Sequence, residues 1–134
     1  MSPQHILLLV LWTKLKLTHT CQLQNSIEYT IFTRTDSDLK TDQIISTTTS
    51  ADYLFIDMKS GTTLCKDMFN ITHQINILTI KAPNLHTIES DFLKNQPITG
   101  DVTIDDTKLE IIKKHTFRNL DISTIYLIFN QIKV

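Results

Sequence analysis

Few side chains of this chain have the types and the spacing that chemistry requires. The five histidines show neither the HExxH spacing of a zinc protease nor a close pairing with cysteine that would hold zinc. Residues 60–63, Ser-Gly-Thr-Thr, lack the lysine and the second glycine of a phosphate-binding loop, so they are interpreted as a turn. Catalysis needs a nucleophile, a base and an orienting group that converge, and the sequence offers no such set. We therefore expect no enzyme activity, no catalytic residue and no cofactor.

One acidic group, formed by Asp101, Asp105 and Asp106, has the oxygen ligands that calcium prefers. Asp101 comes just before a predicted strand, whereas Asp105 projects from the exposed face of that strand, so the carboxylates point in different directions. Solvated charges are the better interpretation, and we expect no metal site. The basic pair Lys113 and Lys114 is likewise interpreted as a solvated surface on the side opposite the predicted sheet.

The size and charge of the chain restrict its class. A chain of 134 residues is large enough for one domain but too small for two domains with separate cores. With 13 basic and 14 acidic side chains, nothing indicates nucleic acid or an anionic membrane as a partner. Isoleucine and threonine are abundant, whereas glycine and proline are rare, and β-branched residues favour strands over helices.

The elements that would position any functional side chain are indicated by a spacing that recurs about every 24 residues. Apolar-x-apolar triplets begin at Leu54, Leu78, Val102 and Ile125, so successive offsets are 24, 24 and 23 residues. A fixed period in this range is typical of a solenoid, in which each unit buries its apolar face only by stacking on its neighbours. We expect the triplets to form one parallel sheet. The opposite side of the core would be lined by Leu64, Phe69, Ile88, Ile112 and Phe117.

The repeat resembles that of the leucine-rich repeat family. The segment Ile122-x-x-Ile125-x-Leu127-x-x-Asn130-x-Ile132 has the family's LxxLxLxxNxL pattern, and residues 102–120 have the extended form of animal extracellular repeats. The asparagine is replaced by Lys59, Pro83 and Thr107 in the other copies, so we expect irregular, looser turns there. The resemblance implies an α/β-type solenoid, with a short parallel β-sheet on its concave face and irregular or short helical convex segments.

Three parts of the chain are predicted. Residues 1–20 would be a signal peptide, since the apolar run from Ile6 to Trp12 is too short to cross a bilayer and small residues follow it; a buried first strand or an uncleaved anchor is the alternative. Residues 21–53 would be an N-terminal cap. Residues 54–134 would hold about three full repeats and a partial fourth.

A secreted, extracellular protein follows from the signal peptide, and two further features fit that location. Asn70 begins the only glycosylation sequon. Cys21 and Cys65 would form a disulfide in an oxidising compartment, although two unpaired thiols remain the alternative. No segment is expected to span a membrane.

The resemblance implies binding of another protein through the concave sheet face, in immune, adhesion or receptor-like recognition. The predicted binding residues are Phe55, Asp57, Thr79, Lys81, Thr103, Asp105, Tyr126 and Ile128. No C-terminal cap is recognisable, so a homodimer or heterodimer through the uncapped C-terminal end, or a truncated relative of longer repeat proteins, is also expected. A β-rich carrier of a small apolar ligand is the alternative from another class, and a hydrolase with a site built from distant residues is the least favoured.

Overall fold

The computed structural model of the protein describes residues 26–129, apart from the side chains of residues 106, 107 and 129. Nearly all of its regular structure is β-strand. The strands are β1 (Ile27–Phe32), β2 (Ser37–Asp42), β3 (Ile45–Thr47), β4 (Ala51–Asp57), β5 (Thr63–Leu64), β6 (Phe69–Ile71), β7 (Ile75–Lys81), β8 (Thr87–Ile88), β9 (Asp101–Thr107), β10 (Ile111–Ile112) and β11 (Thr124–Phe129). The predicted signal peptide lies outside the described residues.

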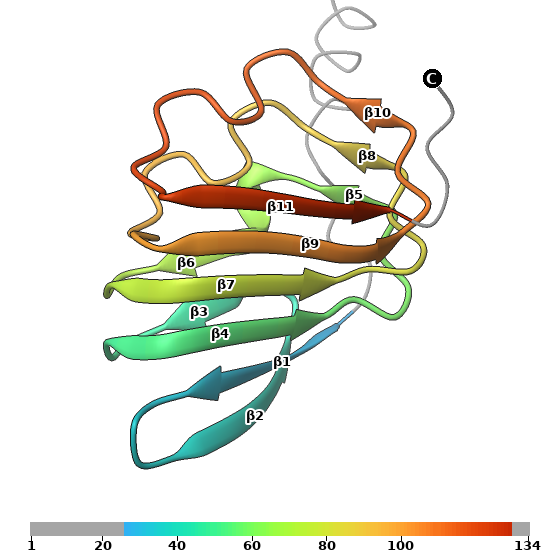
Figure 1. Ribbon diagram of the computed structural model, residues 1–134. Helices are drawn as coiled ribbons and strands as arrows, with labels where there is room; N and C mark the ends of the chain where they lie inside the picture. The colour runs from blue at the N-terminus through green and yellow to red at the C-terminus, as the bar shows by residue number, and fades with distance from the viewer. Residues whose placement is uncertain (1–25, 130–134) are drawn as a thin grey trace, which may run out of the picture.

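The largest sheet has six strands in the order β11-β9-β7-β4-β1-β2, and we call it the long sheet (Figure 1). Its strands β4, β7, β9 and β11 run parallel, one from each successive coil. Leu54 pairs with Leu78, and Leu78 pairs with Val102, so the triplets lie side by side in register. The predicted stacking of coil upon coil is therefore confirmed, and the chain folds as a β-solenoid.

The opposite side of each coil also consists of short strands. β5, β8 and β10 form a three-stranded parallel sheet, which we call the short sheet, and β3 pairs in parallel with β6. Among the described residues the helical structure is limited to the 3-10 turn η1 (Lys66–Met68). The solenoid is therefore shown, whereas the expected α/β architecture with irregular or short helical convex segments is not shown beyond this one turn. The physical reason is that two-residue strands on that side already pair with the equivalent strands of the neighbouring coils.

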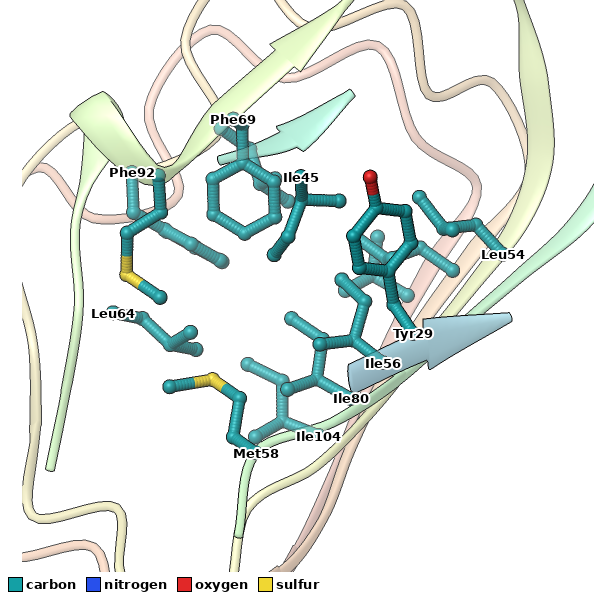
Figure 2. Packing of buried hydrophobic residues seen from close by; sticks show 14 of the residues in the cluster. Tyr29, Ile45, Leu54, Ile56, Met58, Leu64, Phe69, Ile80, Phe92 and Ile104 are labelled. Carbon is teal, nitrogen blue, oxygen red and sulfur yellow. The ribbon is translucent and has the colours of Figure 1, made fainter. Parts of the chain in front are cut away.

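The hydrophobic core lies between the long sheet and the short strands. Ile56, Ile80 and Ile104 follow one another along the inner face of the long sheet, and Leu64 and Phe92 lie across the core from them (Figure 2). All five side chains are fully buried. Because every coil contributes equivalent positions, the apolar contacts form one continuous cluster from β1 to the last described coil.

Aromatic rings form a second stack on the far side of this core. The Phe69 and Phe92 ring centroids lie 6.2 Å apart, and those of Phe92 and Phe117 lie 6.0 Å apart, both with edge-to-face geometry. Edge-to-face pairs at this distance are favourable because the ring edge is positive and the face is negative. The ring of Phe92 thus links three coils.

One core position was predicted wrongly. Ile112 continues the row of Leu64 and Ile88 in the short sheet, but its side chain is 44% exposed, whereas those two are fully buried. No described strand lies beyond β10 in the short sheet, so nothing in the described part of the chain covers Ile112. Periodicity identifies an inward-facing position, but burial at that position needs a further coil.

The N-terminal side of the stack begins with the antiparallel hairpin β1–β2. Strand β1 pairs with β4, so the hairpin extends the long sheet at its first coil. The backbone N–H of Thr33 donates to the carbonyl of Asp36 at 2.8 Å, which closes the hairpin turn. Ile27, Tyr29 and Ile31 point into the core and cover its first coil. The described part of the chain has no helix long and apolar enough to cross a membrane.

Hydrogen bonds between neighbouring coils hold the turns that leave β4 and β7. The backbone N–H of Met58 donates to the carbonyl of Lys81, and that of Ala82 donates to the carbonyl of Asp105. At Lys59, where the family pattern has asparagine, the carbonyl accepts a 2.7 Å hydrogen bond from Nδ2 of Asn84 in the next coil. Hydrogen bonds between coils therefore satisfy backbone groups that the missing asparagine would otherwise have served.

Candidate functional site

The outward face of the long sheet corresponds to the face predicted to be concave, and its side chains lie in straight rows across the strands. Backbone pairing aligns six residues, one per strand, which we call the central row: Leu39, Thr30, Phe55, Thr79, Thr103 and Tyr126. They alternate with the buried core positions, so their side chains point outward. The structure thus brings the predicted residues Phe55, Thr79, Thr103 and Tyr126 into one row.

The central row has Leu39 at one end and Tyr126 at the other, with threonines and Phe55 between them. Leu39 is 62% exposed and Tyr126 is 50% exposed, and Phe55 is half-buried between its neighbours. Thr79 and Thr103 are half-buried and lie between the two aromatic residues. Threonine side chains are short and have a restricted χ1, so they leave a firm, nearly flat surface between the aromatic side chains.

A second row of mixed charge runs beside the central row, and we call it the charged row. Glu28 pairs with Asp57, Asp57 with Lys81, and Lys81 with Asp105. Lys59, in the turn after β4, extends its Nζ to within 3.2 Å of the Glu28 carboxylate. Exposed pairs of this kind contribute little to stability, so their main effect is to fix the pattern of charge along this edge of the face.

One predicted site residue departs from the row. Ile128 was expected to follow Asp105 in the charged row, but the pairing of β11 with β9 shifts register between Leu127 and Phe129. Ile128 lies at this irregularity and is 48% exposed on the edge strand. Such a break in register changes the direction of one side chain. The alternation of apolar and polar residues in the sequence does not predict where the break occurs.

A third row, the apolar row, was missed by the sequence analysis. It consists of Phe32, Tyr53 and Ile77, which pair in sequence from β1 to β4 to β7 on the other side of the central row. The rings of Phe32 and Tyr53 meet edge to face, with centroids 5.5 Å apart. Tyr53 and Ile77 stand immediately before recognised triplets, so extending the predicted strands by one position would have found them.

The composition of this face resembles that of protein interfaces. Exposed aromatic and aliphatic side chains gather on one side of a rigid sheet, with charges along one border, which is the composition of protein interfaces. In residues 26–129, apart from the side chains not described, no three His, Cys, Asp or Glu side chains come close enough to hold a metal ion. Asp101 and Asp105 occupy different rows of β9.

The predicted modification sites lie away from this face. Asn70 is exposed in β6, beside Ser46 of β3, and the hydroxyl of Thr72 in the same sequon donates to the carbonyl of Thr47 at 2.6 Å. Cys65 is buried next to β5, whereas Cys21 lies outside the described residues. Glycosylation at Asn70 and the Cys21–Cys65 disulfide therefore stay predictions.

The fold and this surface define the class of the protein as a β-rich solenoid with one broad, outward-facing parallel sheet. Comparison of the chain with protein-family models, curated proteins and solved structures gives no match. The resemblance to leucine-rich repeats therefore stays a prediction based on the residues that carry it.

Proposed function

We propose that the protein is a secreted, leucine-rich-repeat-like module that binds another protein through the outward face of the long sheet. The observation that supports this proposal is the alignment of the central row across six strands, with the apolar row on one side and the charged row on the other. Contiguous exposed apolar side chains on one face of a soluble protein indicate an interaction surface.

The rigidity of the sheet favours binding. Four parallel strands are joined to one another by backbone hydrogen bonds, and the buried cluster lies beneath them. A backbone held in this way loses little further conformational entropy on association, so more of the contact energy appears as affinity. Phe55 and Tyr126, at either side of the two threonines, are the proposed anchors, since aromatic residues dominate binding energy at interfaces.

The partner is expected to be a protein rather than a small apolar molecule. A carrier would need the inward apolar positions to line a cavity, whereas here they belong to one contiguous buried cluster. The extracellular setting comes from the predicted signal peptide, disulfide and sequon. No observation favours the truncated, non-functional fragment or the hydrolase.

The test uses charge placed in the middle of the central row. In the double variant Thr79→Lys with Thr103→Lys, two ammonium groups stand on the half-buried positions between the aromatic anchors, where they block close approach without touching the core. The matched control is Thr63→Lys with Thr87→Lys, because these two threonines are also half-buried and also pair on adjacent strands, but of the short sheet.

The partner is first captured with the wild-type chain from extracellular fluid, purified, and titrated against each variant. We expect the Thr79/Thr103 variant to bind at least tenfold more weakly, equivalent to about 1.4 kcal/mol. The Thr63/Thr87 control should bind within twofold of the wild type. Equal affinities for the two double variants would show that the partner uses another surface.

A further inference from the structure

Two strand edges at the same end of the solenoid have no described neighbour. β11 is the last strand of the long sheet and β10 is the last strand of the short sheet, and both belong to the end farthest from the β1–β2 hairpin (Figure 1). Within residues 26–129, neither strand has a neighbour on its outer side. An unpaired strand edge presents a row of backbone N–H and C=O groups that another strand can satisfy.

Apolar side chains surround these two edges. Ile111 is 43% exposed on β10, next to Ile112, and Tyr126 and Ile128 are exposed on β11. The residues equivalent to Ile112 in the preceding coils, Leu64 and Ile88, are fully buried because a further coil covers them. The end of the stack therefore exposes part of a core cross-section that elsewhere is covered.

At the other end of the long sheet, charged residues protect the edge strand β2 from pairing with another chain, whereas β11 has no such charges. Strand β2 carries Asp38, Lys40 and Asp42 among its six residues, and charges on an edge strand disfavour pairing with another chain. The sequence of β11, Thr-Ile-Tyr-Leu-Ile-Phe, has no charge and consists of residues that favour strands. The two edges of one sheet thus differ in the property that controls strand addition.

We propose that this end of the solenoid is the site of self-association, where β11 pairs antiparallel with β11 of a second copy about a two-fold axis. This arrangement joins the two long sheets into one and places the two β10 strands on the same, inner face of the joined sheet. A two-fold interface must be self-complementary, and an uncharged strand meets that condition because no like charges face each other.

The charges beside β11 support the antiparallel direction. Asp121 is exposed just before the strand begins, and Lys108 is exposed in the turn after β9, beside the opposite end of β11. Antiparallel pairing brings the beginning of one β11 near the end of the other, so Asp121 of each copy approaches Lys108 of the other. A parallel pairing would bring like charges together instead.

Self-association doubles the outward face without changing its composition. The central rows of the two copies continue across the shared sheet edge, so a partner with two equivalent sites gains avidity. The proposal stands on the strand edges and their charges, and it does not require that the outward face binds a protein.

The test is sedimentation of the purified mature chain over a wide range of concentrations. The variant Ile112→Lys places a charge on the exposed end of the short sheet, away from the outward face of the long sheet. The control Ile44→Lys places the same charge on an isoleucine of similar exposure, which lies between β2 and β3. We expect a wild-type dimer, a dissociation constant raised at least tenfold by Ile112→Lys, and an unchanged constant for Ile44→Lys.

Hydrogen exchange locates the contact. Amides of residues 124–129 should exchange more slowly at concentrations where the wild-type chain is dimeric than where it is monomeric, while those of β2 should not change. A wild-type chain that stays monomeric at all concentrations overturns the proposal. A dimer that tolerates Ile112→Lys, or that leaves exchange in residues 124–129 unchanged, overturns it as well.

Discussion

The side-chain amide of Asn84 donates a 2.7 Å hydrogen bond to the backbone carbonyl of Lys59, one coil earlier in the stack. The two residues are 25 positions apart in the chain, yet the bond closes the turn between the long and short strands. It therefore joins neighbouring coils at a position where the sequence suggested that the turn would be loose.

Replacement of Asn84 by alanine removes this bond and leaves the Lys59 carbonyl to water. Because the site is exposed, we expect the free energy of unfolding to fall by about 0.5–1.5 kcal/mol, the usual net contribution of one hydrogen bond. Urea denaturation of unglycosylated protein measures the change, with Asn70→Ala as the matched control, because Asn70 is the exposed residue of β6. A loss no greater than that of the control would show that the bond contributes nothing.

Gly100 and Gly61 should respond differently to a single methyl group. A Cβ at Gly100 would overlap the backbone carbonyl oxygen of Asn76 in the neighbouring coil, which cannot move without shifting β7. A Cβ at Gly61 would meet only the terminal methyl of Met58, which can turn aside. We expect Gly100→Ala to cost about 1–3 kcal/mol, as overpacking does, and Gly61→Ala to cost less. Thermal and urea unfolding give both values, and equal costs would contradict the close coil contact at Gly100.

Phe92 should be among the most sensitive core positions. Its ring is fully buried and contacts the rings of Phe69 and Phe117 in the coils on either side. Truncation in Phe92→Ala leaves a cavity at the centre of this stack, so we expect a loss of about 3–5 kcal/mol. Phe92→Leu keeps more of the volume and should lose less. Denaturation curves in which Phe92→Ala costs under about 1 kcal/mol would contradict this packing.

The cysteine prediction can be checked on the secreted protein. Cys65 is buried beside the short sheet, and the chain has one other cysteine, Cys21. We expect peptide mapping without reduction to find the two joined, and reduction to lower the free energy of unfolding because the bond closes a long loop. Labelling of both thiols in unreduced, denatured protein would exclude the disulfide.

The long strands could be predicted from the sequence because two signals coincide there. Alternation with period two marks a strand, and its recurrence after 24 residues places the triplets beginning at Leu54, Leu78 and Val102 next to one another. The rows on the outward face follow from the same register. Four of the predicted binding residues, Phe55 and Tyr126 among them, therefore lie in one row.

Other features have no comparable signal in the sequence. Strands β5 and β8 are two residues long, which is too short for alternation to appear. The expectation of short helical segments on that side therefore came from the family resemblance alone. The exposure of Ile112 depends on what covers the last coil rather than on its own position. Phe32 lies on the outward face because β1 pairs with β4. The residues of β1 do not follow the 24-residue spacing, so this pairing had no sign in the sequence.

The most direct test of the proposed binding face is site-specific photocrosslinking. A benzoylphenylalanine replaces Tyr126 at the end of the central row or, as the control, exposed Lys114 beyond the short sheet. With the captured partner present, we predict a covalent complex from position 126 and none from position 114. Crosslinking from position 114 alone would contradict the assignment of the outward face of the long sheet as the binding surface.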